Sequence, residues 1–342
     1  PDFFLGLTAT PERTDGGDLL ALCDENLVCR CDIPVGIEEG LLCPFHYFGV
    51  PDDVDYSNIP WRSNRFDEEA LTNHLATHAR AQNALEQYRS RGGERTLAFC
   101  CSQRHANFMH DFFHNAGVAS AAVHSGDGSD PRAASLKRLE DGELEVVFSV
   151  DMFNEGVDLP NVDTILMLRP TESKILWLQQ FGRGLRQPEG VDKTLKVIDY
   201  IGNHRVFLNK PEALLHALFA MGPGLDPVRE QLRIVHSGPA ELPPGCEVTY
   251  ETEAINILQG LFPVSDAPGE VSTRRSGRSM VSVPLRQRRT MQVTTPARWD
   301  WATAAGYISS MPWAISVASR KPSWRSTPVA FCRCSTAHRW PR

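Results

Sequence analysis

From residue 94 onward the sequence alternates between short apolar runs and amphipathic stretches, and this alternation limits the possible fold more than any other feature. The apolar runs are five or six residues long and lie at 96–101, 118–123, 146–150, 164–168 and 195–200. Continuous apolar runs are typical of strands whose two faces are both covered. Between the first two runs, residues 109–116 carry the stripe of a packed helix, which Gly117 ends. A second helix is expected from about Pro131 to Glu140. The alternation predicts an α/β fold with a parallel sheet flanked by helices.

The residues before this region predict three further elements. An apolar run at 3–7 predicts a buried strand that ends at Thr8 and Thr10, whose hydroxyls share one face, and Pro11 then stops the ladder. A new strand is expected at 41–50, where Pro44 indicates an edge position. Asp67 is expected to cap a helix that runs to about Tyr88. The weakly periodic residues 12–40 are interpreted as a connector.

Several polar residues follow directly after the predicted strands. Because parallel strands end at one edge of a sheet, these residues are expected to gather there, where open α/β sheets bind ligands. They are Ser102, His124, Asp151 and the segment Gly156-Val157-Asp158. Gly156 would admit close backbone approach, and Asp158 would accept hydrogen bonds from sugar hydroxyls.

Residues 177–186 predict one further helix with an apolar stripe and a polar rim. Leu178, Phe181 and Leu185 share the stripe, whereas a neighbouring stripe holds Gln179, Arg183 and Arg186. Two guanidinium groups and an amide on one rim suit an anion, and polyphosphate is the obvious candidate. The alternative is a surface helix with two solvated arginines.

Composition excludes several classes of protein. No apolar run approaches the length of a membrane span. The nine cysteines are scattered without a Cys-x-x-Cys pair, which disfavours a zinc site or a disulfide framework and favours a reducing cytoplasm. His74 and His78 lie four residues apart, but no third metal ligand is evident. We therefore expect no bound structural metal.

The last 72 residues differ in kind from the rest of the chain. Residues 271–342 hold 13 of the 35 basic residues, one of the 42 acidic residues and five of the seven tryptophans. Helical or strand periodicity is absent from this tail. It is interpreted either as a basic arm that binds single-stranded nucleic acid or, in preference, as a disordered or out-of-frame segment.

Four stretches, in this order, resemble motifs of a known family. Residues 7–13 resemble motif III, residues 97–104 motif IV, residues 151–160 motif V and residues 179–186 motif VI of superfamily-two helicases. Residues 198–205 are similar to a stretch that follows motif VI in one bacterial branch. Residues 1–265 thus resemble the DEAD/DEAH-box type related to type III restriction-enzyme helicase subunits. The resemblance implies a RecA-like fold of the P-loop NTPase type.

The resemblance also implies roles for individual residues. Arg183 and Arg186 would face the γ-phosphate of ATP, at least one of them as an arginine finger. Gly156, Asp158 and Gln179 would complete the nucleotide contacts. Thr8 and Thr10 would couple the nucleotide state to a nucleic-acid groove. That groove would be lined by Ser102, Gln103, His124, Ser125, Gly126 and Asp151.

The family's phosphate loop does not occur in this sequence. No G-x-x-x-x-G-K-[ST] is present, and the first residue is Pro1 rather than Met. We therefore expect a fragment of an ATP-dependent DNA helicase or translocase, inactive alone, whose ATP and Mg²⁺ are bound mainly by a first RecA-like lobe. The expected partners are DNA, with RNA not excluded, that first lobe, and a nuclease or methyltransferase. The competing class is a non-catalytic nucleic-acid-binding or adaptor module.

The motifs and the change in composition give the expected division of the chain. The five segments are the end of the first lobe at 1–11, the connector at 12–40, the second helicase lobe at 41–220, a C-terminal extension at 221–270 and the tail at 271–342.

Overall fold

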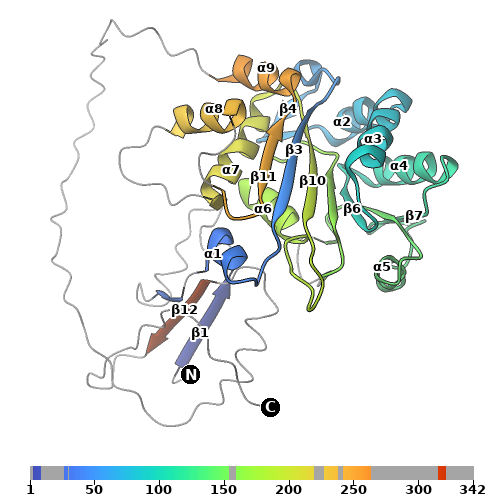
Figure 1. Ribbon diagram of the computed structural model, residues 1–342. Helices are drawn as coiled ribbons and strands as arrows, with labels where there is room; N and C mark the ends of the chain where they lie inside the picture. The colour runs from blue at the N-terminus through green and yellow to red at the C-terminus, as the bar shows by residue number, and fades with distance from the viewer. Residues whose placement is uncertain are drawn as a thin grey trace, which may run out of the picture.

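A seven-stranded parallel sheet forms the centre of the protein (Figure 1). The computed structural model describes residues 3–8, 27–29, 31–153, 159–218, 227–237, 242–262 and 315–320. The strand order is β11-β3-β10-β9-β6-β8-β7. In chain order the strands are β3 (Phe45–Pro51), β6 (Thr96–Phe99), β7 (Ser120–Val123), β8 (Val146–Ser149), β9 (Thr164–Met167), β10 (Leu195–Ile201) and β11 (Glu247–Tyr250). The predicted α/β fold with a parallel sheet is confirmed.

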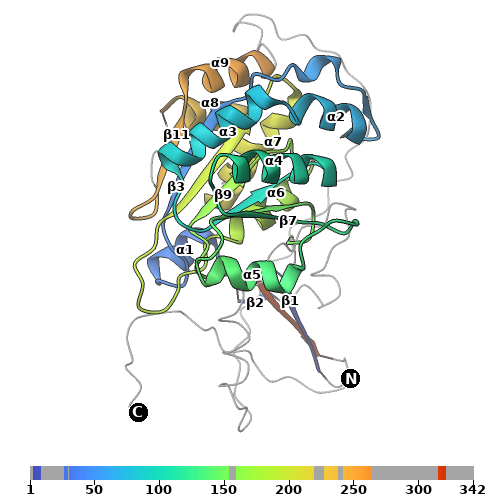
Figure 2. The same ribbon diagram turned by 90° about the vertical axis from the view of Figure 1, so that its right-hand side faces the viewer.

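Helices cover both faces of this sheet. They are α1 (Ile33–Glu38), α2 (Glu68–Leu75), α3 (His78–Arg91), α4 (Gln103–Asn115), α5 (Arg132–Glu140), α6 (Lys174–Gly182), α7 (Asn209–Leu218), α8 (Pro227–Ser237) and α9 (Thr252–Leu261). Two short 3₁₀ turns, η2 (Tyr56–Asn58) and η3 (Arg205–Leu208), follow β3 and β10. Helices α3 and α4 lie across one face, and Figure 2 shows them in front of the sheet. On the other face α6, α7 and α9 contribute to the larger core.

The strand side chains explain why two layers of helices are needed. Successive residues of β6 alternate between the two cores, with Leu97 and Phe99 in one and Ala98 in the other. All four residues of β6 are buried. Phe113 of α4 packs edge-on against Phe148 of β8, with 5.0 Å between ring centroids. A strand buried on both faces reads as a continuous apolar run, and this is the pattern that predicted it.

Two predictions for the region before β6 need correction. The single helix expected from Asp67 to Tyr88 is two helices, because Thr77 interrupts α2 and starts α3 by accepting a hydrogen bond from the backbone of Arg80. The cap at Asp67 is confirmed, since its side chain accepts from the backbone N–H of Ala70 at 2.9 Å. The edge position expected from Pro44 is wrong. Pro44 precedes β3, and β11 and β10 pair with that strand on its two sides.

A small antiparallel sheet lies outside the seven-stranded one. It has the order β1-β12-β2, with β1 at Phe3–Thr8, β2 at Leu27–Cys29 and β12 at Ile315–Arg320. The strand expected at 3–7 is therefore present. Six residues of the tail form β12, although no strand periodicity was expected there. The rest of the tail lies outside the described residues, and the five-part division of the chain stays a prediction.

A buried ion pair links β10 to α7. The Asp199 carboxylate pairs with the Lys210 ammonium, and both side chains are fully buried. Asp199 also accepts hydrogen bonds from the Tyr47 hydroxyl at 3.0 Å and the Trp177 indole N–H at 2.9 Å. Lys210 donates in addition to the backbone carbonyl of Tyr200 at 2.7 Å. Each charge thus has its counter-charge and at least one further hydrogen bond, which is what makes buried charges tolerable.

Removal of one member of this pair is expected to be costly. Lys210→Ala leaves the Asp199 carboxylate buried without its counter-charge, so the free energy of unfolding is expected to fall by about 3–5 kcal/mol. Urea denaturation followed by circular dichroism measures this loss. Lys174→Ala is the matched control, because Lys174 pairs with Glu212 at a partly exposed position and its loss is expected to cost less than about 1 kcal/mol. Equal costs for the two variants would contradict the role given to Lys210.

None of the helices in the described part of the chain is long and apolar enough to cross a membrane.

Candidate functional site

Two loops meet at the edge of the sheet where the strands end, here named the carboxyl edge. The Gln103 side chain, after β6, donates from Nε2 to the Ser125 hydroxyl, after β7, at 3.4 Å. Both residues are exposed. A Cβ atom at Gly126 would lie 2.0 Å from Gln103 Oε1, so glycine lets the Gln103 side chain lie against this loop. The loops therefore come together although β8 separates their strands.

Ser102 and His124 shape these loops from the inside. Ser102 is buried and caps α4, accepting from the backbone N–H of His105 at 3.2 Å and from the Thr72 hydroxyl at 2.7 Å. His124 is buried too and accepts at Nδ1 from the backbone N–H of Gly126 at 3.1 Å. This bond places the ring proton on Nε2, which lies 3.0 Å from Asn107 Oδ1. The exposed groups of the two loops are thus Gln103, Ser125 and the backbone of Gly126 rather than Ser102 or His124.

Asp151 follows β8 at the same edge and adopts a left-handed backbone conformation with φ 51°. Its carboxylate accepts from Arg169 Nη1 at 3.0 Å, and Arg169 also pairs with Glu172. Arg169 follows β9 and is mostly buried. The sequence analysis missed Arg169, although its position after a predicted strand is the signal that identified Asp151. Gly156 and Asp158 lie outside the described residues, as does Thr10, and only the strand assignment is described for Thr8.

The helix predicted at 177–186 instead spans Lys174–Gly182, and its earlier end changes where the polar residues lie. Helix α6 ends at Gly182, Arg183 is its C-cap, and Arg186 forms an isolated bridge with Leu42. Gln179, Arg183 and Arg186 therefore do not share one helical stripe. Glycine at 182 and 184 disfavours helix, and a Cβ at Gly184 would lie 2.2 Å from Leu195 Cδ1.

The segment after α6 is held against the starts of two strands. The backbone N–H of Cys43 donates to the carbonyl of Leu185 at 2.8 Å, directly before β3. Phe181 and Leu185 are fully buried, whereas Arg183 and Arg186 are half-buried. The two arginines thus lie at the opposite edge from Gln103 and Asp151, here named the amino edge.

Lys193 fastens this segment to the end of the motif V stretch. Its ammonium donates to the backbone carbonyls of Pro160 at 2.8 Å, Val162 at 3.1 Å and Gly184 at 2.8 Å. Burial lowers the pKa of Lys193, and the nearby Cys43 and Asp163 oppose that shift. Lys193 was not predicted from the sequence, because its three acceptors are backbone carbonyls, which every residue has. The Lys193 ammonium thus holds the segment before β9 against the segment after α6.

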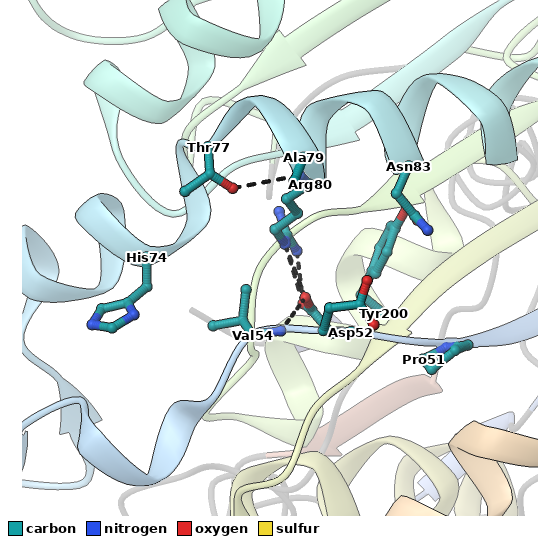
Figure 3. A pocket seen from close by; sticks show the side chains of 10 residues that line it. Pro51, Asp52, Val54, His74, Thr77, Ala79, Arg80, Asn83 and Tyr200 are labelled. Atoms are coloured by element: carbon teal, nitrogen blue, oxygen red, sulfur yellow. Dashed lines mark hydrogen bonds and ion pairs between the residues drawn. The ribbon is translucent and has the colours of Figure 1, made fainter.

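A cavity of about 240 Å³ opens at the carboxyl end of β3 (Figure 3). Its wall contains the buried ion pair of Arg80 with Asp52, at 2.9 Å. Arg80 also donates to the carbonyl of Leu168 at 3.0 Å, and Asp52 accepts from the Tyr56 hydroxyl at 2.7 Å. The Arg80 guanidinium lies 4.9 Å from the centre of the Tyr200 ring. Arg80 therefore joins α3 to the ends of β3 and β9, and its charge is already balanced within the protein.

No three histidine, cysteine or acidic side chains gather as a metal-ligand set within the described ranges. His74 and His78 are both exposed, and His78 packs against Phe108 with 5.5 Å between ring centroids. They are thus helix-surface residues.

His105 lies beneath the motif IV loop and is fully buried. It accepts at Nδ1 from the backbone N–H of Cys101 at 3.4 Å. Burial, with the nearby charges of Arg80 and Arg169, holds the pKa of His105 well below its ordinary value. His105 is therefore neutral in the folded protein, and its imidazole accepts the hydrogen bond from Cys101 in that form.

A pH dependence of stability follows from this burial. The unfolded chain binds a proton at His105 below about pH 6.5 and the folded chain does not, so stability is lost as pH falls through that value. His105→Gln is expected to reduce the loss between pH 7.5 and 5.5 by about 1 kcal/mol. Urea denaturation of both proteins at the two pH values measures the difference. Identical pH profiles would contradict the assignment.

The parallel sheet flanked by helices gives the class of the described lobe, a RecA-like α/β domain. Residues 79–187 match the family described as helicase conserved C-terminal domain. The resemblance to the second lobe of superfamily-two helicases is confirmed, and the chain carries a helicase C-terminal domain.

Three individual proteins are similar to parts of this chain. The Saccharomyces cerevisiae protein IRC3, named as an ATP-dependent helicase, is 30% identical over 215 residues, which are 62% of this chain and 31% of the relative. A 51.5 kDa protein of a Lactococcus phage is 24% identical over 199 residues, covering 58% of this chain and 43% of the relative. An HsdR subunit fragment of a type I restriction enzyme from Vibrio vulnificus has a TM-score of 0.40 and 24% identity, covering 49% of this chain and 34% of that one. The chain thus spans less than half the length of the two sequence relatives.

Proposed function

We propose that this chain supplies the second lobe of an ATP-dependent DNA helicase or translocase. Arg183 and Arg186 act on ATP that is held, with Mg²⁺, mainly by a first RecA-like lobe. The observation that carries the proposal is the Lys193 bridge, which holds the carbonyls of Pro160 and Val162 against that of Gly184. The end of motif V, at Pro160, and motif VI, at Gly184, both expected to contact nucleotide, are thereby held together.

The chemistry of the two arginines suits this role. A guanidinium group is always charged and donates two parallel hydrogen bonds, so it neutralises charge on a transferring phosphoryl group. Arg183 follows the helix directly and Arg186 is anchored by the bridge to Leu42, so neither depends on a long loop for its position. Gln179, half-buried one turn earlier, with Gly156 and Asp158, would complete the contacts to the nucleotide.

Nucleic acid is proposed to bind at the carboxyl edge. Gln103 and Ser125, beside Gly126, donate to phosphate oxygens, whereas Ser102 and His124 shape the loops that present them. Asp151, held by Arg169, flanks this surface. Contacts of this kind grip the backbone without reading bases, as movement along any sequence requires. Thr8 and Thr10 would couple this surface to the nucleotide.

The remaining assignments belong to the whole protein. A nuclease or methyltransferase partner is proposed from the resemblance to restriction-enzyme helicase subunits. A cytoplasmic location is proposed from the cysteines, of which Cys43, Cys100, Cys101 and Cys246 form no disulfide in the described part of the chain.

The isolated chain is expected not to turn over ATP. Arg183 and Arg186 stabilise a transition state but do not bind the β-phosphate or Mg²⁺, and the sequence has no G-x-x-x-x-G-K-[ST] loop to do so. Phosphate release by the purified 342-residue chain, with and without single-stranded DNA, measures this. Turnover well above a buffer blank would defeat the two-lobe proposal.

Joined to a first lobe that carries the phosphate loop, the chain is expected to support DNA-stimulated ATP turnover. Arg183→Ala should then lower turnover by about 10³-fold or more, since an arginine finger contributes at the transition state. Arg138→Ala is the control, because Arg138 is an exposed residue of α5 and its loss should change nothing. ATP turnover unchanged by Arg183→Ala would favour the non-catalytic adaptor.

A further inference from the structure

A short hairpin at the carboxyl edge carries an exposed tryptophan and two arginines. Strand β4 (Trp61–Arg62) pairs antiparallel with β5 (Arg65–Phe66), and the turn residues Ser63 and Asn64 have φ of 49° and 61°. Left-handed conformations at both turn positions are typical of the tightest hairpin turn. The register places Trp61 opposite Phe66 and Arg62 opposite Arg65. The aromatic pair and the arginine pair therefore point to opposite sides of the hairpin.

The tryptophan is anchored on one side and open on the other. Trp61 packs at 4.7 Å between ring centroids against both Phe66, which is buried, and His204. It nevertheless keeps 36% of its surface exposed. Trp177, by comparison, is fully buried. An indole that is held by its neighbours yet exposed to solvent offers a stacking surface at little cost in side-chain entropy.

The arginine pair is unfavourable for the hairpin alone. Like charges directly opposite on two strands destabilise their pairing. Arg62 and Arg65 are exposed, and neither forms an ion pair with any acid in the described ranges. Of the nearby acids, Asp67 caps α2 and Asp55 accepts from Ser57 and Asn203, whereas Glu68 and Glu69 in the first turn of α2 are exposed and pair with neither arginine. An anionic partner would relieve the repulsion.

The hairpin lies beside the proposed nucleic-acid surface. It leads directly into α2, where Thr72 donates to Ser102 and Asn73 accepts from Arg104, both in the motif IV region. Its other neighbour, His204, follows β10 at the same edge. Figure 1 shows β4 next to the carboxyl end of β3. A single strand of nucleic acid bound at Gln103 could thus extend along the carboxyl edge to the hairpin.

We propose that the β4–β5 hairpin is a stacking platform for single-stranded nucleic acid, with a base on Trp61 and phosphates on Arg62 and Arg65. The platform rests on the proposed function, since it extends the same surface. Aromatic stacking combined with guanidinium contacts to the backbone binds single strands without sequence preference. An acidic peptide would satisfy the arginines but would not need an open indole face on the other side of the same hairpin.

The test is binding of a fluorescein-labelled thymidine 20-mer, and separately of a uridine 20-mer, to the 342-residue chain, measured by anisotropy. Trp61→Ala is expected to weaken binding roughly 5- to 150-fold, the range for loss of one stacked base. Trp61→Phe keeps a stacking ring and should restore most of the affinity. Unlabelled oligonucleotide should quench tryptophan emission in the wild-type chain, and Trp61→Phe should remove that part of the quench.

The arginines are tested by salt dependence. Replacing both Arg62 and Arg65 by glutamine should flatten the slope of log K against log salt by about 1.4, the value for two phosphate contacts on a single strand. Replacing Lys137 and Arg138, two exposed basic residues of α5, is the matched control and should leave the slope unchanged.

The outcomes separate the platform from the proposed function. Binding by the wild type with no loss in Trp61→Ala would overturn the platform and leave the proposed surface standing. Absence of binding by the wild type at low salt would overturn both. A loss in Trp61→Ala accompanied by a lower unfolding temperature, with no rescue by Trp61→Phe, would assign Trp61 a structural role and overturn the platform. A loss that Trp61→Phe rescues supports it.

Discussion

The parallel pairing of seven strands is the constraint on which both candidate surfaces depend. Because every strand runs the same way, all the strands end at one edge and begin at the other. Helix α6 has nine residues and so returns the chain by about 13 Å, close to the length of the four-residue strands β6 and β9. It therefore delivers Arg183 to the amino edge, while Gln103 and Asp151 stay at the carboxyl edge.

The sequence predicted correctly those elements whose residues are set by burial or by local capping. The runs that became β6, β7, β8, β9 and β10 are apolar because helices cover both faces, and the caps at Asp67 and Gly117 follow from local chemistry. It was wrong where tertiary contacts overrule local preference. Pro44 suggested an edge strand, but β11 comes from two hundred residues later to pair with β3. Helix α6 stops at Gly182 because the residues after it contact the starts of β3 and β10 instead. Leu185 accepts a hydrogen bond from the backbone of Cys43, and Gly184 lies against Leu195.

The missed residues share one physical property, which is that their partners are backbone carbonyls or distant side chains. Lys193 binds three carbonyls, and Arg80 binds the carbonyl of Leu168 together with Asp52. A carbonyl is present at every position, so nothing in the sequence marks it as an acceptor. Arg169 was the exception, since its place after an apolar run was visible in advance. Sequence patterns thus find the residues exposed at the ends of strands more readily than the buried cations that fix those ends.

Charge decides how the carboxyl edge would hold a polyanion. The chain has a net charge of −7, and the excess of basic residues lies in the tail, so long-range attraction to nucleic acid is weak over the lobe itself. Binding must then come from contacts shorter than the Debye length of about 8–10 Å. Hydrogen bonds from Gln103 and Ser125 are such contacts, and so is stacking, which is insensitive to net charge. On an acidic lobe that binds single strands, stacking would therefore add to these hydrogen bonds, and on the described surface Trp61 is an exposed aromatic side chain that could supply it.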